Sequence, residues 1–233
     1  MRSQIKKTNF HAGFGEHRRM VSMRRTVTTT VFCLATLVIL AGCGRVRYPQ
    51  YYALNLPAPP DPPASENAHA TLAIREFSAP MYLRQGAIAY KASPEQIGFY
   101  TYDRWAIDPR DAVTDAVIDR LRASGAFAFV KPYDGRPGAG YVLSGRLEKL
   151  DEVDYEGSVK VEIALSAQMT SIATGATVWS NAVSEVGAVN KRDVPGVVSA
   201  MDSAMERAVK ELLSPMPVDL ATSPAAKNNL AIQ

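Results

Sequence analysis

The chain has 233 residues, among them 26 basic and 23 acidic side chains, two cysteines and three histidines. Residues 1–42 contain seven of the basic side chains and one of the acidic ones, which leaves 19 basic and 22 acidic groups, a formal charge of about −3, beyond residue 42. A slightly acidic chain has no general electrostatic attraction to nucleic acid, so nucleic acid is excluded as a partner. Beyond Cys43 there is no cysteine, and the one histidine is His69, which argues against a Ser-His-Asp or Cys-His enzyme and against a zinc site.

The amino-terminal region has the layout of a secretory signal. An apolar run without charges extends from Thr26 to Ala41, follows two arginines and ends in small residues. As a helix it would be about 24 Å long, which is short for the ~30 Å hydrocarbon core that a single-pass anchor, the alternative, must cross. We therefore expect residues 1–42 to be a signal peptide. Because Met23 is a second possible start, residues 1–22 are either an unusually long extension or lie before the true start.

Leu40-Ala41-Gly42-Cys43, at the end of this run, is similar to a bacterial lipobox. The similarity implies that the signal is cut between Gly42 and Cys43, that the Cys43 thiol receives a diacylglycerol, and that the new amino group is acylated. Two or more acyl chains hold a protein on a membrane stably, whereas one chain does so only marginally. In such lipoproteins an aspartate after the cysteine favours the inner membrane. Gly44 stands there instead, so we expect an anchor in the outer membrane with the protein facing the periplasm.

Proline-rich and polar sequence follows the predicted lipid site. Six of the 15 prolines lie between residues 49 and 63, and such sequence forms a semi-rigid extended spacer. We expect residues 43–70 to be a lipidated stalk that holds the domain up to ~80 Å from the membrane. Within it, Tyr51-Tyr52-Ala53-Leu54 is apolar enough to dock on the domain. The polar residues 214–233 are expected to be a disordered tail.

Residues 71–213 suit a single domain with one core. The clearest element is Val159–Met169, where alternate side chains are apolar, as in a half-buried antiparallel strand. With a neighbour on either side it forms a predicted three-stranded meander. Periodicity and turn residues predict strands, in chain order, at residues 72–77, 87–91, 98–105, 126–131, 141–150, 159–169 and around 178–179.

Two amphipathic helices are predicted as well. The first begins at the cap Asp108, with Pro109 in its first turn, and ends at Ser124, while the second extends from near Asp193 to Ser214. Each helix has one apolar stripe, and the clearest strand has one apolar face. The sequence therefore predicts an α+β fold, a single two-layer domain in which a mainly antiparallel sheet carries both helices on one face.

Two clusters with some likeness to ligand sites have simpler interpretations. Gly135, Gly138 and Gly140 are not followed by a Lys-Ser/Thr pair or by a helix, so a turn is favoured over a phosphate loop. The acidic residues within 151–156 match no calcium loop and are expected at a solvated hairpin tip. We therefore predict neither a cofactor nor a metal site.

Aromatic side chains gather within 24 residues of the domain: Tyr82, Tyr90, Phe99, Tyr100, Tyr102 and Trp105. Aromatic residues with a polar tip favour interfaces, so we predict a partner interface at Tyr82, Tyr90, Tyr100, Arg104 and Trp105. The alternative is that most of these residues are structural, with Arg104 and Trp105 stacked to fix the entry to the first helix.

The order of motifs along the chain resembles that of a known family. The lipobox is followed by Tyr51-Tyr52-Ala53-Leu54-Asn55-Leu56-Pro57, then by Met81-Tyr82-Leu83-Arg84, then by Tyr102-Asp103-Arg104-Trp105-Ala106 before a capped helix, and last by an amphipathic helix. Together these features resemble the ABC-type transport auxiliary lipoproteins, which accompany MCE (mammalian cell entry) transport systems. The resemblance covers nearly the whole chain beyond Cys43.

The resemblance implies a non-catalytic lipoprotein, tethered to the outer membrane by its lipid, that helps to move lipids between the inner and outer membranes. Its partners would be an MCE-type protein, an ABC permease and ATPase, and other copies of itself in a homo-oligomer. One alternative is an outer-membrane lipoprotein that activates or scaffolds a cell-envelope complex for wall synthesis or secretion. A second is a periplasmic hydrolase using carboxylates, which the lack of a paired-carboxylate motif disfavours.

Overall fold

The computed structural model of the protein describes residues 46–60, 70–155 and 157–216. The chain divides into two compact units, residues 1–47 and 48–233, and the second contains every helix and strand of the described residues. The predicted signal peptide, its cleavage site, the lipid site Cys43 and the tail from residue 217 onward lie outside the described ranges. Within those ranges no helix is long and apolar enough to cross a membrane.

One eight-stranded sheet, two α-helices and a short 3-10 helix make up the described part of the second unit. The strands are β1 (Gln50–Tyr52), β2 (Thr71–Ile74), β3 (Ala87–Lys91), β4 (Ile97–Trp105), β5 (Phe129–Pro132), β6 (Tyr141–Val153), β7 (Lys160–Ser171) and β8 (Thr177–Ala188). The helices are η1 (Met81–Gln85), α2 (Pro109–Ala123) and α3 (Val194–Leu213).

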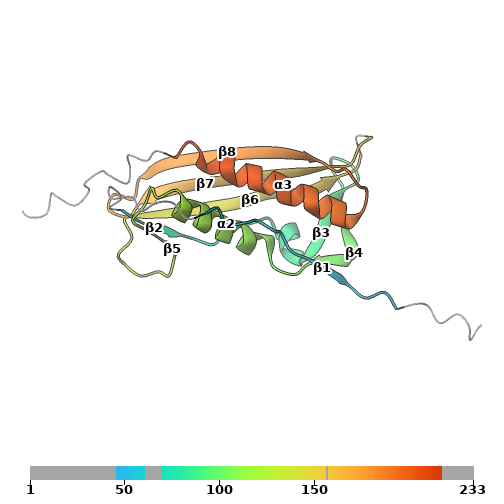
Figure 1. Ribbon diagram of the computed structural model, residues 1–233, viewed down its shortest axis with the longest axis horizontal. Helices are drawn as coiled ribbons and strands as arrows, with labels where there is room; N and C mark the ends of the chain where they lie inside the picture. The colour runs from blue at the N-terminus through green and yellow to red at the C-terminus, as the bar shows by residue number, and fades with distance from the viewer. Residues whose placement is uncertain (1–45, 61–69, 156, 217–233) are drawn as a thin grey trace, which may run out of the picture. The chain divides into compact units, whose positions relative to one another are not determined.

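The long strand β6 organises the sheet (Figure 1). On one side, β7 pairs antiparallel with β6 and β8 pairs antiparallel with β7, which confirms the predicted meander. On the other side two short strands share the edge of β6, with β2 beside Tyr141–Leu143 and β3 beside Glu152 and Val153. The sheet therefore forks into a β2–β5 branch and a β3–β4–β1 branch.

Most of the paired residues belong to antiparallel ladders, as predicted, but the two branches also contain parallel pairings. These join β1 with β4, β2 with β5, β2 with β6, and β3 with β6. Parallel strands need a long crossover connection, here supplied by elements such as α2 between β4 and β5. Such pairings depend on where the crossover returns the chain, and no local pattern predicted them.

Both helices begin at the predicted cap residues. Asp108 accepts a hydrogen bond of 3.0 Å from the backbone N–H of Arg110 at the start of α2, and Asp193 accepts one of 2.9 Å from Gly196 at the start of α3. Both helices lie on the same face of the sheet, α3 along β7 and β8, and α2 beside it (Figure 1). The predicted two-layer α+β architecture is therefore confirmed.

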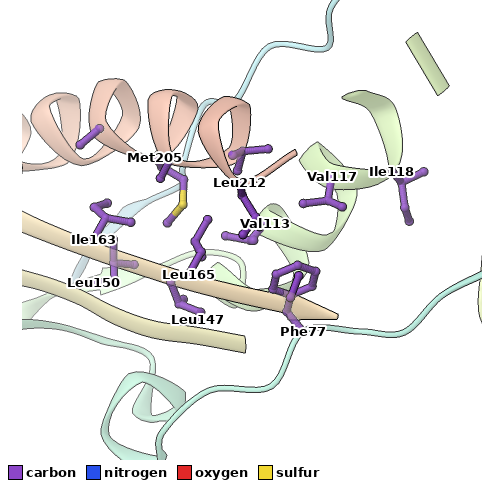
Figure 2. Close-up of a cluster of buried hydrophobic side chains, with 14 of the residues drawn as sticks. Phe77, Val113, Val117, Ile118, Leu147, Leu150, Ile163, Leu165, Met205 and Leu212 are labelled. Atoms are coloured by element: carbon purple, nitrogen blue, oxygen red, sulfur yellow. The ribbon is translucent and has the colours of Figure 1, made fainter. Parts of the chain in front are cut away.

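The core fills the space between the sheet and these helices (Figure 2). Alternate residues of β7 are buried, as its pattern predicted: Val161, Ile163, Leu165, Ala167 and Met169. Leu165 lies opposite Leu147 of β6 and Val183 of β8. Met205 and Leu212 of α3 are also fully buried members of this cluster. Burial of each such side chain contributes about 1.5–3 kcal/mol, which makes this the main stabilising layer.

The chain enters the domain at β1, earlier than predicted. β1 lies parallel to β4, with Tyr52 beside Trp105. The carbonyl oxygen of Tyr52 also accepts a hydrogen bond of 2.7 Å from the N–H of Ala106. Strand β1 therefore closes one branch of the sheet, although its sequence lies within the range expected to form a stalk.

The segment after β1 packs on α3. The N–H of Asn55 donates a hydrogen bond of 3.0 Å to Asp202 Oδ1, and Leu54 and Leu56 pack against the core. Burial raises the pKa of Asp202, and the hydrogen bond from Asn55 opposes that shift. The expectation that the apolar segment docks on the domain is confirmed, so the described residues 50–56 belong to the domain.

Strand β2 is shorter than predicted and ends at Ile74. Beyond it, the ring of Phe77 is fully buried against Gly145 of β6, where an added Cβ would lie 2.2 Å from the ring atom Cζ. The N–H of Phe77 donates a hydrogen bond of 3.0 Å to Thr114 Oγ1 of α2. A glycine is needed at position 145 because any side chain there would occupy the space of the ring.

Candidate functional site

The predicted interface residues lie on η1 and on the β3–β4 hairpin. The rings of Tyr90 and Tyr100 face each other across the hairpin with centroids 5.3 Å apart. Gly98 leaves room for the Tyr90 ring, because a Cβ there would lie 2.3 Å from it. The Tyr100 hydroxyl donates a hydrogen bond of 2.7 Å to Glu152 Oε2 of β6. The two tyrosines therefore connect the hairpin to the central strand.

Asp151, the preceding residue of β6, points to the opposite face of the sheet, because strand side chains alternate. Its side chain is completely buried, and Lys91 Nζ of β3 lies 3.4 Å from its Oδ2 atom. The hydroxyl of Tyr82, from η1, interacts with the same carboxylate. Neither carboxylate oxygen has a hydrogen bond of good geometry from the described residues. Asp151 is thus a buried acid whose partners are the Tyr82 hydroxyl and Lys91.

The environment of the two acids shifts their titration. Burial raises the pKa of Asp151, and the contacts with Tyr82 and Lys91 oppose the shift only in part. Burial raises the pKa of Glu152 as well, against the effect of the hydrogen bond from Tyr100. Burial and the neighbouring carboxylates raise the pKa values of Tyr82 and Tyr100, so these two tyrosines remain protonated donors at neutral pH.

The prediction that the acidic residues within 151–156 lie at a solvated hairpin tip is wrong for Asp151 and Glu152. Asp151 is 0 % exposed and Glu152 is 5 % exposed, because β6 continues to Val153 inside the sheet. Acids are rarely so buried unless they are paired. The sequence signal was the aromatic cluster itself, since Tyr82 and Tyr100 are the partners of these acids, but they lie far earlier in the chain.

The other two predicted interface residues differ in exposure. Trp105 is 7 % exposed and belongs to the core, beside Tyr52 of β1. Arg104 is half-buried and pairs in register with Tyr51 and with Ala87. Of the predicted interface residues, Tyr82 and Tyr100 therefore contact acids of β6, whereas Trp105 lies in the core beside β1.

The arrangement is suited to joining elements of the fold. Lys91 and Tyr82 contact the buried Asp151 carboxylate, and the Tyr100 hydroxyl donates a hydrogen bond to Glu152. Breaking such a buried pair is costly, because it leaves an uncompensated charge. Within the described ranges there is no group of three His, Cys, Asp or Glu side chains that could hold a metal ion.

The sheet face opposite the helices carries an open groove of about 680 Å³ across β6, β7 and β8. Small and polar side chains line it, among them Ser144, Arg146, Ser166 and Gln168. Arg146 Nε donates a hydrogen bond of 2.7 Å to Glu148 Oε2, and Ser166 Oγ donates one of 2.9 Å to Glu148 Oε1. The lining contains none of the large apolar or aromatic side chains that are typical of small-molecule pockets.

Comparison with known proteins identifies the family. Residues 52–212 match the model of the ABC-type transport auxiliary lipoprotein component, from the end of β1 to the last turn of α3. The match covers well over half of the chain, and the protein belongs to this family. The resemblance that the sequence motifs indicated is confirmed. No curated protein matches the chain.

Solved structures share the fold at low sequence identity. A protein from Xanthomonas campestris is 20% identical with a TM-score of 0.61, over 70% of this chain and 92% of that one. Another crystal structure is 14% identical with a TM-score of 0.55, over 70% of this chain and 95% of the other. The PelC dodecamer from Paraburkholderia phytofirmans is 18% identical with a TM-score of 0.43, over 67% and 93%. Similarity at this level concerns the fold alone.

Proposed function

We propose that the protein is a non-catalytic lipoprotein, anchored in the outer membrane through Cys43 and facing the periplasm, that serves an MCE-type ABC transport system. In this role it helps to move lipids between the inner and outer membranes, beside an MCE-type protein, an ABC permease and an ATPase. Membership of the auxiliary lipoprotein family, over residues 52–212, carries the proposal.

The path of the chain supports an anchored domain. Strand β1 begins at Gln50, close in sequence to Cys43, and is built into the sheet beside β4. A lipid on Cys43 would therefore hold the folded domain itself near the membrane. A component that receives or caps material at the outer membrane needs this placement.

The use of the buried polar groups supports a non-catalytic role. Asp151 and Glu152 are the most buried acids of the described residues, and their partners are Lys91 and Tyr100 within the same fold. Groups occupied in this way stabilise the β3–β4 branch and are not free to act as an acid–base pair.

We assign the partner contact to the tip of the β3–β4 hairpin. Residues 94–97 are exposed there, with Ile97 39 % exposed. The Tyr90–Tyr100 pair and the Tyr100–Glu152 hydrogen bond hold this tip on β6. The predicted interface residues would then support the contact from beneath and would not all meet the partner.

Three measurements test the proposal. Mass spectrometry of the mature amino terminus is expected to find diacylglycerol and an acyl chain on Cys43, and density fractionation is expected to place the protein in outer membranes. Crosslinking and purification of the lipidated chain should recover an MCE-type protein and a permease. An unmodified Cys43, or recovery of a wall-synthesis or secretion complex in place of transport components, would contradict the proposal.

A matched pair of variants tests the hairpin tip. Ile97→Ser is expected to reduce recovery of the partner, because it removes an exposed apolar contact. Ile172→Ser, at the β7–β8 turn and 50 % exposed, should leave recovery unchanged. Equal recovery with both variants would remove the hairpin tip from the interface.

A further inference from the structure

Large apolar side chains are exposed where the chain enters the domain. Tyr48 is 78 %, Tyr51 65 %, Met81 69 % and Ile107 55 % exposed. Single exposed apolar side chains are common on soluble proteins, whereas a group of them marks a contact surface. We call these four residues the entry patch.

Backbone hydrogen bonds place β1 beside the end of β4. The Tyr52 carbonyl accepts a hydrogen bond of 2.7 Å from the N–H of Ala106. Tyr51 directly precedes the acceptor and Ile107 directly follows the donor. These two exposed side chains are therefore carried by neighbouring segments, although they are far apart in the sequence.

Helix η1 adjoins the same end of β4. The carbonyl of Gly86, the residue after η1, accepts a hydrogen bond of 2.8 Å from the N–H of Trp105. Arg84 of η1 lies near enough to Asp108 to contribute to lowering the pKa of that carboxyl. Met81, at the start of η1, thus belongs to the region that carries Ile107, and Arg84 of the same helix is exposed there.

The entry patch is close along the chain to the predicted lipid site. A fully extended chain from Cys43 to Tyr48 spans at most about 18 Å. The residues that follow Tyr48 are held in the sheet by the pairing of β1 with β4. A lipid on Cys43 therefore keeps Tyr48 within about 18 Å of the membrane surface, whatever the conformation of the chain between them.

We propose that the entry patch rests on the membrane surface, with its tyrosine, methionine and isoleucine side chains among the lipid headgroups. This inference rests on the proposed anchoring through Cys43. Tyrosine is favoured at membrane–water interfaces because its ring is apolar and its hydroxyl stays hydrated. A second copy or another protein would also cover apolar side chains, but the short tether favours the lipid surface, which is always within reach.

Contact at the entry patch orients the domain. Strand β1 is linked through β4 and β3 to the Val153 end of β6, whereas β5 is linked through β2 to the Tyr141 end, so β5 would lie toward the end of the sheet away from the membrane. Phe129 of β5 is 71 % exposed and provides a control position with a similar apolar side chain.

Fluorescent labels at single cysteines test the contact. Cys33 is lost with the predicted signal and the lipid occupies the Cys43 thiol, so an introduced cysteine is the sole free thiol. Met81→Cys and Ile107→Cys are labelled with NBD in the lipidated protein, on vesicles of phosphatidylethanolamine and phosphatidylglycerol. A headgroup spin label is expected to reduce emission at both positions about twofold. Phe129→Cys and Ile172→Cys should keep their emission.

The outcomes separate this inference from the anchoring. Protein that floats with the vesicles but shows no quenching at Met81→Cys and Ile107→Cys overturns the membrane contact and leaves the anchor in place. A shift of NBD emission without quenching indicates that a protein surface covers these positions, and this outcome also overturns the membrane contact.

Protein that does not float contradicts the anchoring. The chain from Cys43 onward is then coupled through the Cys43 thiol to a maleimide lipid, and hydrogen exchange of residues 81–86 and 102–107 is compared on vesicles and in solution. Slower exchange on vesicles supports the contact, and equal exchange overturns it.

Discussion

The two sides of β6 are held together by different forces. On the β7–β8 side, a continuous row of buried apolar side chains packs under α3 over two long antiparallel ladders. On the β1–β4 side, fewer buried apolar side chains, among them Ile88 and Trp105, are joined by a tyrosine–carboxylate hydrogen bond, a buried ion pair and a hydrogen bond to α3. Apolar burial acts over the whole layer, whereas each polar contact contributes about 1 kcal/mol. We call the β7–β8 side the scaffold and the β1–β4 side the attachment, and we expect the attachment to open locally before the scaffold does.

The largest effect is expected in the scaffold. Leu165→Ala should lower the free energy of unfolding by about 3 kcal/mol, because it leaves a cavity beneath α3 in a fully buried site. Denaturant unfolding measures the change. Val186→Ala, on β8 and 55 % exposed, is the control and should stay within about 0.5 kcal/mol of the wild type. A small effect of Leu165→Ala would mean that this row is not the main stabilising layer.

The second largest loss of stability is expected from overpacking at Gly145 of β6. Gly145→Ala places a methyl group against the Phe77 ring and should destabilise the protein by about 2 kcal/mol in denaturant unfolding. Adding Phe77→Leu should recover part of the loss, because the smaller side chain vacates the space. If the double variant loses the full sum of both single effects, the close approach is not the cause.

Loss of the hydrogen bond between Tyr100 and Glu152 should increase local opening of the β1–β4 side and leave the β7–β8 side unchanged. Tyr100→Phe leaves the buried Glu152 carboxylate without its donor, at a cost of about 1–3 kcal/mol. Hydrogen exchange should accelerate in residues 87–105 and change little in β7. Tyr51→Phe, at an exposed position, is the control. Equal acceleration in β7 would show that the two sides unfold together.

The hydrogen bond between Asn55, in the segment after β1, and Asp202 of α3 is expected to contribute less to stability than the Tyr100–Glu152 hydrogen bond. Asp202→Ala removes the acceptor of the Asn55 N–H and should cost about 1 kcal/mol, confined to residues 50–56. Hydrogen exchange of that segment is the measurement, and Asp119→Ala on α2 is the control. Unchanged exchange would mean that β1 and the apolar contacts alone hold the segment.

The smallest effect is a dependence on pH. Because burial raises the pKa of Asp151, the folded state binds its proton more tightly than the unfolded state does. The contribution of Asp151 to stability therefore falls as the pH rises from its ordinary value of 3.8 through the raised pKa. Relative to Asp151→Asn, the wild type should become more stable on acidification from neutral pH. A relative loss on acidification would contradict the assigned direction.

Elements with local signals were predictable. The caps Asp108 and Asp193 set the starts of α2 and α3, because a cap acts on backbone groups only two or three residues away. The alternation of apolar residues in β7 predicted its buried face, because successive side chains of a strand point to opposite faces of the sheet. Of the site, the aromatic residues were found as a group, but the acids that they bind were placed in solvent.

The sequence by itself determined the secondary structure of the scaffold, the motifs of the family and the predicted lipid site. The tertiary structure alone decided that β1 enters the sheet beside β4, that Tyr100 meets Glu152, and that Lys91 meets Asp151. The reason is physical. Periodicity and caps depend on neighbours within a few residues, whereas a parallel pairing or a buried polar contact depends on where long crossovers bring distant segments.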